Sequence, residues 1–341
     1  MKDIYIFAIE TSCDETSCSI VKNGKEEIAT VILSQIDIHK NFGGVVPEVA
    51  SRNHAQMITK VFEETLIKSN MTMDQIDAIA VTYGPGLNGA LLIGVEAAKA
   101  LAYAYNKPLI PVNHMAGHIY ANNIVGEFKF PLLALVVSGG HTEIIYMENE
   151  YKFKKIGGTL DDSIGEAYDK VARVIGVCYP GGPTIDKYAL EGKHSYNLPT
   201  PKDDDSYDFS FSGIKSAVIN LVHNEIQRGN EINKLNLAAS FQETVVNILI
   251  KKTKRAIKEY QVKQLLVAGG VSANNSLRTE LTKLCKELNI ELLKPSIKYC
   301  TDNAAMIGCA AYYAYLRGDR ADSTLDPIPG LDLDEGCDGN E

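Results

Sequence analysis

The chain has 341 residues, of which 34 are basic and 43 acidic, giving a formal net charge of −9. At roughly 150 residues per domain this length predicts two compact domains, and a composition of 45% hydrophobic and 23% charged residues excludes disordered and fibrous proteins. The acidic surplus argues against indiscriminate binding of nucleic acid, although it leaves room for a local basic groove.

The first residues, MKDIYIFAIETS, lack the long apolar run and the cleavage site of a secretory signal. The most apolar stretch, residues 89–105, contains Glu96 and Lys99, so it predicts a buried helix rather than a membrane span. Seven cysteines without a C-x-x-C pair do not indicate a disulfide framework. We therefore expect a cytoplasmic protein with reduced thiols and no membrane contact.

Two segments share the pattern of a strand, a tight polar turn and a second strand. Residues 4–10 lead into residues 16–21, and residues 132–137 lead through SGGH into residues 142–147. Apolar runs alternate with helical patterns elsewhere in the chain, which favours the α/β class. The repeated hairpin indicates two structurally related lobes.

The last third of the chain contains another strand and a charged end. Residues 264–270 form an apolar run closing on two glycines, and an amphipathic helix follows with Ser272 or Asn274 as its N-cap. The final residues, 326–341, contain six acids and no base, which predicts a disordered tail and leaves the rest of the chain near −3.

His114 and His118 are the sharpest local signal. If the segment is helical, their i,i+4 spacing places both imidazoles on one face, ready to bind one metal ion. A third ligand would be a carboxylate or histidine from a distant element. The alternative is that both are simply polar helix residues near a surface.

Three patterns known from other protein families occur in the chain only in part. The zincin pattern needs a glutamate directly after the first histidine, where this chain has Met115, so a metal here would bind or polarise a substrate rather than activate water for peptide hydrolysis. The run from Gly84 to Gly89 fits G-x-G-x-x-G, the fingerprint of dinucleotide binding, which also needs an acid about 20 residues later for the ribose. No acid occurs between Glu96 and Glu127, so a closely packed turn is a better interpretation than a dinucleotide site.

The third pattern is S-x-x-K at Ser212 to Lys215, with Thr301-Asp302-Asn303 downstream. It is typical of penicillin-binding acyl enzymes, but no K-T-G accompanies it. Because the segment opens a helix after an aspartate-rich loop, we expect helix capping rather than a serine nucleophile.

Three glycine pairs follow strand or helix ends, at residues 139–140, 181–182 and 269–270. Such pairs let backbone N–H groups face an anion without an obstructing Cβ atom, although each alone is commonly an ordinary turn. Together with the matching hairpins they suggest a nucleotide held between two lobes, with Asp169 and Asp186 accepting hydroxyl hydrogen bonds. The basic helix at residues 251–258 is either a solvated face or a phosphate contact.

Ten motifs occur in order along the chain: ETSCDET, GGVVPEVASRNH, TYGPGLNGALLIGV, NHMAGH, VSGGHTE, GEAYDKVAR, YPGGP, FSFSGIKSAV, AGGVSANNSLR and CTDNAAMIG. In this order they resemble a known family, the bacterial form of the tRNA N6-adenosine threonylcarbamoyltransferases, once labelled O-sialoglycoprotein endopeptidases. The resemblance covers roughly residues 3–320. Asn53 stands where the family commonly has an acid, and the acidic tail lies outside the pattern.

The resemblance implies a duplicated, two-lobed α/β fold of the actin and sugar-kinase type with a nucleotide cleft. We expect lobe I at residues 1–130 and 296–325, lobe II at 131–295, and the disordered tail at 326–341. The implied activity is transfer of a threonylcarbamoyl group from threonylcarbamoyl-AMP to N6 of the adenosine just 3′ of the anticodon, in tRNAs reading codons that begin with A.

The resemblance also implies the site residues. Asp302 would complete a metal site with His114 and His118 for one divalent ion, Fe²⁺ by resemblance or Zn²⁺, since two histidines and an aspartate suit both. His141 is a candidate proton acceptor. The donor would be bound by Val137, Ser138, Gly139, Gly140, His141, Asp169, Gly182, Asp186 and Asn274.

An exocyclic amine is a poor nucleophile, so the acyl group must arrive activated, and a metal can orient it as a Lewis acid. The anticodon loop is already single-stranded, which makes its adenosine accessible. The family implies three helper proteins: an inactive paralogue as heterodimer partner, a small P-loop ATPase and a threonylcarbamoyl-AMP synthase. Two other functions remain open, a metal-dependent glycoprotein endopeptidase and a non-enzymatic actin-like nucleotide-binding scaffold.

Overall fold

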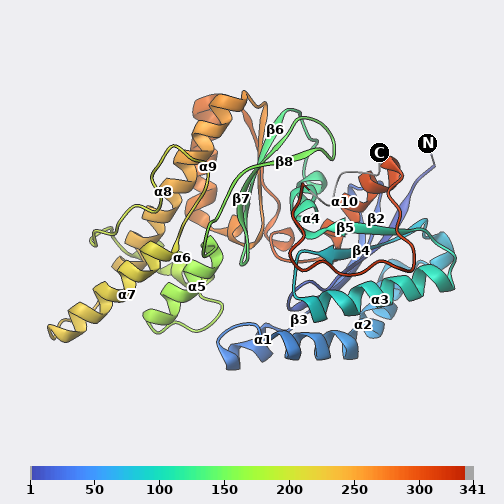
Figure 1. Cartoon of the computed structure of the whole chain (residues 1–341), viewed down its shortest axis with the longest axis horizontal. Helices are drawn as coiled ribbons and strands as arrows, with labels where there is room; N and C mark the ends of the chain where they lie inside the picture. Colours follow the sequence, from blue (N-terminus) through green and yellow to red (C-terminus); the bar gives the residue numbers. More distant parts are fainter. Residues whose placement is uncertain (1, 335–341) are drawn as a thin grey trace. The chain divides into compact units, whose positions relative to one another are not determined.

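The computed structural model describes residues 2–334, so the end of the predicted tail, residues 335–341, lies outside the described part. The chain forms two compact units, which Figure 1 shows with the elements labelled. Unit 1 consists of the described parts of Met1–Phe128, Asn149–Lys154 and Pro295–Glu341, and unit 2 consists of Lys129–Glu148 and Lys155–Lys294.

Unit 1 contains a five-stranded sheet in the order β3-β2-β1-β4-β5. The first three strands pair antiparallel, whereas β4 is parallel to both β1 and β5. The central strands β1 and β4 are almost fully buried because helices cover both faces of the sheet there, whereas the edge strand β3 is mostly half-buried or exposed. The strands are β1 (Tyr5–Glu10), β2 (Glu15–Lys22), β3 (Glu26–Ser34), β4 (Ala78–Gly84) and β5 (Leu109–Asn113).

The sheet of unit 2 has the corresponding order, β8-β7-β6-β9-β10. Here β6 and β7 form the antiparallel hairpin, and β9 is parallel to β6 and to β10. The expected α/β class and the duplication are therefore confirmed, since each sheet continues from an antiparallel hairpin into two parallel strands. The strands are β6 (Leu132–Val137), β7 (Thr142–Met147), β8 (Phe153–Gly158), β9 (Gln264–Ala268) and β10 (Glu291–Leu293).

Helices cover the strands of each unit. In unit 1, α10 packs on α4 and β1, and α2 packs on α3 and β2. The helices of unit 1 are α1 (Ile36–His39), α2 (Pro47–Ser69), α3 (Asn88–Ala104), α4 (His114–Tyr120) and α10 (Ala304–Arg317). Among residues 2–334, none of the helices combines the length and apolar character that crossing a bilayer requires.

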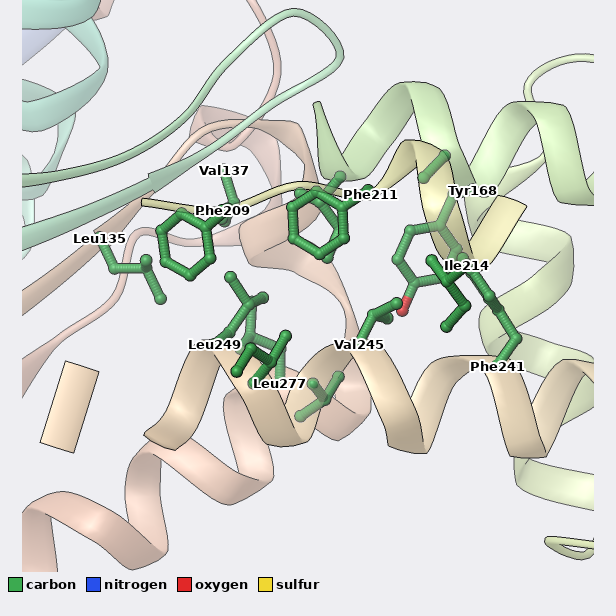
Figure 2. Close-up of a cluster of buried hydrophobic side chains, with 14 of the residues drawn as sticks. Leu135, Val137, Tyr168, Phe209, Phe211, Ile214, Phe241, Val245, Leu249 and Leu277 are labelled. Carbon is green, nitrogen blue, oxygen red and sulfur yellow. The ribbon is translucent and has the colours of Figure 1, made fainter. Parts of the chain in front are cut away.

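In unit 2 the longest helix, α8, packs against α6 and α9, and its apolar face meets the core. Figure 2 shows Phe209 and Phe211 above Leu249 and Val245 of this helix, beside Tyr168. The helices of unit 2 are α5 (Ile164–Val174), α6 (Gly182–Glu191), α7 (Ser212–Gln227), α8 (Lys234–Tyr260) and α9 (Asn275–Leu288).

The prediction of a disordered tail is wrong for residues 326–334. Ile328 N donates to Tyr83 O at 2.7 Å, at the end of β4, and this bond ties the segment to unit 1. Leu331 and Leu333 alternate with the aspartates and are only 6% and 2% exposed. Burial of these two side chains outweighs the tendency of the acids to stay solvated.

The glycine-rich turn after β4 packs closely, as expected. A Cβ atom on Gly84 would lie 2.2 Å from Ile328 O, and one on Gly86 would lie 2.7 Å from Ser12 O. Backbone therefore occupies the space that a dinucleotide phosphate would need above these glycines, which excludes the dinucleotide interpretation of this turn.

Ser212 opens α7, and its hydroxyl donates to the carboxylate of Asp161 at 2.6 Å. The same carboxylate accepts from Phe211 N at 2.7 Å, so the residue that caps this helix end is Asp161. Lys215 pairs with Asp162 at 2.6 Å. Ser212 is engaged in a structural bond and Lys215 in an ion pair, which contradicts a serine nucleophile with a lysine base.

Candidate functional site

The predicted histidine pair lies on the short helix α4, which follows β5 directly. Asn113, the last residue of β5, caps the helix by accepting from Met115 N at 2.8 Å and Ala116 N at 3.4 Å. This cap starts the helix at His114 and brings His118 one turn later onto the same face. The two rings meet edge to face, with their centroids 4.6 Å apart.

Asp302 reaches the same place from the other end of unit 1's sequence. It precedes α10, whose first turn is capped by Asn303 through a 3.0 Å bond from Met306 N. Asp302 Oδ1 lies 3.5 Å from His114 Nε2 and 3.1 Å from His118 Nε2. The three candidate ligand atoms all lie within 4.8 Å of one another.

A buried carboxylate that the sequence reasoning missed holds the other nitrogen of His114. Glu10, at the end of β1, places Oε2 3.1 Å from His114 Nδ1. Thr82 donates to the same oxygen at 2.6 Å, and Ser12 N donates to the other oxygen at 2.5 Å. The available signal was an acid at the end of an apolar strand, in the motif ETSCDET.

The charges in this cluster reinforce one another. Burial acts to lower the pKa of His114, but the carboxylates of Asp302 and Glu10 outweigh it and raise that pKa to about 9. Burial acts to raise the pKa of Glu10, but the charge and hydrogen bond of His114 outweigh it and hold the pKa of this carboxyl below its usual range. The negative charges of Glu10 and Asp302 therefore favour a cation beside the imidazoles.

The donor set fits a divalent transition-metal ion. His118 is buried, and its Nδ1 has no hydrogen-bond partner within residues 2–334, while its Nε2 lies 3.1 Å from Asp302 Oδ1 without the geometry of a hydrogen bond. An unpaired buried nitrogen is costly unless a ligand satisfies it. Two imidazoles and one carboxylate leave coordination positions for a substrate, and Glu10 supplies the outer carboxylate that such sites commonly have.

Met115 occupies the position where a zincin has its catalytic glutamate. Its side chain is 2% exposed and packs in the interior. The α4 helix therefore presents the histidine pair without an adjacent base, in agreement with the interpretation of the sequence.

In unit 2, the predicted loop from Val137 to His141 joins β6 to β7. Ser138 N donates to His141 O at 2.8 Å, and His141 N donates to the Ser138 hydroxyl at 3.1 Å, which closes the turn. A Cβ atom on Gly139 or Gly140 would meet no atom of residues 2–334 within 4 Å, and neither glycine has the left-handed backbone that favours this residue. The loop thus exposes its backbone to open space.

The other two glycine pairs each combine a packed and an open glycine. A Cβ atom would lie 2.2 Å from Ala172 Cβ at Gly181 and 2.4 Å from Val137 O at Gly269. At Gly182 and Gly270 it would meet no described atom within 4 Å. All three pairs therefore leave backbone open to a molecule that approaches closely.

Asp169 points at the second of these loops from α5. Its Oδ1 accepts from Gly181 N at 2.7 Å. Burial raises the pKa of Asp169 above the ordinary aspartate value, and the N–H groups of Gly181 and Gly182 oppose that rise. Its visible role is to hold the loop in place.

Asp186 and Asn274 join one polar network with Gln242, which the sequence reasoning missed. Gln242 Nε2 donates to Asp186 Oδ1 at 2.9 Å, while its Oε1 accepts from Asn274 Nδ2 at 2.8 Å. Asn274 Oδ1 also caps α9 through Leu277 N at 2.9 Å, as expected from the sequence. Gln242 lies mid-helix on α8, where nothing in the local sequence distinguishes it from a solvated polar residue.

The basic face of α8 is largely neutralised. Lys251 pairs with Asp203 at 2.5 Å, and Lys254 pairs with Glu287 at 2.7 Å. Lys252 is buried, and donates to Asp208 O at 2.7 Å. These contacts favour a structural role for this helix face over binding of a phosphate backbone.

Comparison with known proteins identifies the relatives of this chain. The family model described as "TsaD: tRNA N6-adenosine threonylcarbamoyltransferase" matches residues 26–309. A tRNA N6-adenosine threonylcarbamoyltransferase of Staphylococcus carnosus (strain TM300) is 57% identical over 335 residues, and one of Staphylococcus aureus (strain JH9) is 58% identical; both matches cover 98% of this chain and 98% of the relative.

Solved structures share the fold at much lower identity. Component A of the (R)-2-hydroxyglutaryl-CoA dehydratase of Acidaminococcus fermentans matches with a TM-score of 0.55 at 17% identity, over 92% of this chain and 98% of that one. HypF of T. kodakarensis matches with a TM-score of 0.62 at 14% identity, over 95% of this chain and 49% of that one. The chain itself belongs to the tRNA N6-adenosine threonylcarbamoyltransferase family.

Proposed function

We propose that the chain transfers the threonylcarbamoyl group of threonylcarbamoyl-AMP to N6 of the adenosine just 3′ of the anticodon, in tRNAs reading codons that begin with A. The observation that carries the proposal is 57% identity to a tRNA N6-adenosine threonylcarbamoyltransferase over 98% of both chains. Two groups of residues support the proposal: the possible metal ligands in unit 1 and the glycine-rich loops in unit 2.

His114, His118 and Asp302 would hold one divalent ion, for which Fe²⁺ is favoured by the family resemblance and Zn²⁺ is compatible with the same donors. When bound, such an ion supplies Lewis acidity that orients an acyl donor and spreads developing negative charge. Glu10 fixes the orientation of His114 through its Nδ1.

The open glycine backbone of unit 2 would bind the donor. Within Val137–His141, the open backbone at Gly139 and Gly140 would admit a phosphate or carbonyl oxygen, and Gly182 and Gly270 expose backbone in two further loops that are distant in sequence. Asp169 keeps one loop in position. The network around Asp186 and Asn274 would support the adenylate, while Gln242 keeps their side chains oriented.

The reaction forms one C–N bond and breaks one C–O bond. The adenosine N6 attacks the carbamoyl carbon, the bond to the phosphate oxygen breaks, and AMP leaves with the electron pair. N6 loses one proton during the transfer, and we assign its acceptance to the His141 imidazole, since an imidazole can take a proton near neutral pH.

The tRNA anticodon loop is the acceptor in this proposal. Its adenosine is already single-stranded, so its presentation costs less than extrusion from a duplex. The proposal keeps the three helper proteins that the family resemblance implies: an inactive paralogue, a small P-loop ATPase and the synthase that makes threonylcarbamoyl-AMP. It also keeps a cytoplasmic location, where such a tRNA is processed.

A reconstituted reaction tests the proposal. The metal-loaded chain and its helper proteins are incubated with unmodified tRNA, threonine, bicarbonate and ATP, and the digested RNA is analysed for threonylcarbamoyladenosine. We expect the product with wild-type protein and its loss with Asp302→Ala, while the melting temperature shows that the variant is folded. Replacement of exposed Asp205 by Asn is the matched control and should retain activity.

Absence of product with the metal-loaded wild-type protein would overturn the proposal. Cleavage of a glycoprotein that depends on His114 would instead support the endopeptidase alternative. ATP-dependent assembly without modified RNA would support the scaffold alternative. Retained activity in His141→Gln would remove His141 as the proton acceptor and leave the transfer itself intact.

A further inference from the structure

Helix α5 begins directly against the loop from Val137 to His141. Ser163, its N-cap, accepts from Glu166 N at 3.1 Å. The same hydroxyl donates to Gly139 O in the loop. A serine hydroxyl has one donor and two acceptor sites, so it makes both bonds at once.

The bond to Gly139 is not required for capping. A cap needs only the acceptor function of the side chain, toward the N–H groups of the first turn. The donor function of Ser163 is directed at the loop instead, and the residue is buried. Loss of the hydroxyl would therefore leave the carbonyl of Gly139 without this partner as well as weaken the cap.

A second contact brings the helix backbone itself against the loop. Gly165 N donates to Ser138 O at 3.2 Å. A Cβ atom on Gly165 would lie 2.5 Å from Ser138 O and 2.8 Å from Gly139 Cα. Only a glycine allows this close approach without a shift of the loop.

The same helix also holds the second open loop. Asp169, about one and a half turns after Ser163, accepts from Gly181 N at 2.7 Å. One rigid helix thus contacts both the Gly139–Gly140 loop and the Gly181–Gly182 loop. Both loops expose glycine backbone, which has more conformational freedom than any other and must be held to bind a ligand well.

We propose that Ser163 is a positioning residue for the acyl donor: it locks the Gly139–Gly140 loop to α5 and so fixes that loop relative to the loop that Asp169 holds. This inference rests on the proposed function, because it assigns the two loops to threonylcarbamoyl-AMP. Loss of the Ser163 hydroxyl should therefore weaken binding of threonylcarbamoyl-AMP and leave binding of tRNA unchanged.

The test compares Ser163→Ala with a variant that loses a helix cap elsewhere in unit 2. Asn233 caps α8 by accepting from Asn236 N at 3.0 Å, so Asn233→Ala is the matched control. We expect Ser163→Ala to raise the KM for threonylcarbamoyl-AMP about five-fold, which corresponds to the usual net contribution of one hydrogen bond. The KM for tRNA should not change. Asn233→Ala should lower the melting temperature similarly without changing either KM.

Two further variants separate the loop contact from folding. Ser163→Thr keeps both hydroxyl functions and should restore the donor KM to near the wild-type value. Gly165→Ala favours the helix intrinsically, but its methyl group displaces the loop, so it should raise the donor KM while the protein stays folded. Calorimetric titration with AMP gives a second readout that needs no turnover.

The outcomes distinguish this inference from the proposed function. If Ser163→Ala and Asn233→Ala have the same donor KM and the same AMP affinity, Ser163 is only a cap and the inference is overturned. If wild-type protein forms no product but binds AMP more tightly than Ser163→Ala, the proposed transfer fails while the loop-positioning role stands. If wild-type protein neither forms product nor binds AMP, both are overturned.

Discussion

Glu10 Oε2 lies 3.1 Å from His114 Nδ1, and Asp302 Oδ1 lies 3.5 Å from the other ring nitrogen of the same imidazole. Glu10 therefore orients the His114 ring, while Asp302 lies close to Nε2 of both His114 and His118. Glu10 is itself held by Thr82 and the backbone of Ser12. This chain of bonds fixes His114 before any ligand binds, as outer carboxylates do in metal sites.

The first prediction concerns this orienting carboxylate. Glu10→Gln keeps the shape of the side chain but removes its charge, so the affinity for a divalent ion should fall about 10- to 100-fold. The measurement is competition of the purified protein with a chelator of known affinity. Glu96→Gln, which alters an exposed acid of α3 paired with Lys99, is the control and should not change the chelator midpoint. An unchanged midpoint for Glu10→Gln would exclude an orienting role.

The second prediction concerns the open backbone of Gly140. A Cβ atom there meets no described atom within 4 Å, so Gly140→Ala should change the free energy of unfolding by less than about 0.5 kcal/mol. If the donor lies on this backbone, the new methyl group should raise the KM for threonylcarbamoyl-AMP. Gly86→Ala, whose Cβ atom would lie 2.7 Å from Ser12 O, should instead lower the melting temperature. A normal donor KM in Gly140→Ala would place the donor elsewhere.

The third prediction concerns the segment that follows α10. Leu331 is 6% exposed, so Leu331→Ala should lower the free energy of unfolding by about 2 kcal/mol, the lower range for a buried leucine. Leu316→Ala alters a leucine that is 57% exposed and should have a much smaller effect. Urea denaturation measures both variants. Equal stabilities would mean that the segment contributes nothing to the folded state in solution.

The fourth prediction concerns acid denaturation. Burial acts to raise the pKa of Asp162, but the hydrogen bonds and charges of Lys170 and Lys215 outweigh it and hold that pKa below its usual range. A carboxyl group with a lowered folded-state pKa stabilises the fold above its unfolded pKa, near 3.9 on average, and loses this contribution as the pH falls through the folded pKa.

Asp162→Asn should therefore lower the free energy of unfolding by about 1 kcal/mol at pH 7 and low salt. The difference from wild type should shrink below about pH 4. Melting temperatures measured from pH 7 to pH 3 provide the check, with Asp205→Asn as an exposed control. A difference that persists unchanged at pH 3 would show that charge is not the cause.

Features with a local origin were predictable. The hairpins at residues 4–21 and 132–147 were predicted from strand-like segments on either side of tight polar turns, and both occur in the structure. The spacing of His114 and His118 predicted one shared helix face, which α4 provides. Asp302 was different, because only the family resemblance, and no local pattern, connected it with this pair.

Features that depend on distant packing were not predictable. Glu10 contacts His114 across 104 positions of sequence, and Gln242 meets Asp186 across 56. The composition of residues 326–334 favoured a solvated tail, yet Leu331 finds a buried position that only the folded unit 1 offers.

Periodicity, turn chemistry and motif order were enough to establish the α/β class, the duplication and the family, since these depend on short-range backbone preferences and on residues read in line. The partners of each buried polar group were decided by the tertiary fold. A hydrogen bond needs two groups within about 3 Å, and which groups come that close depends on how whole strands and helices pack, including the contact of Ser163 with Gly139.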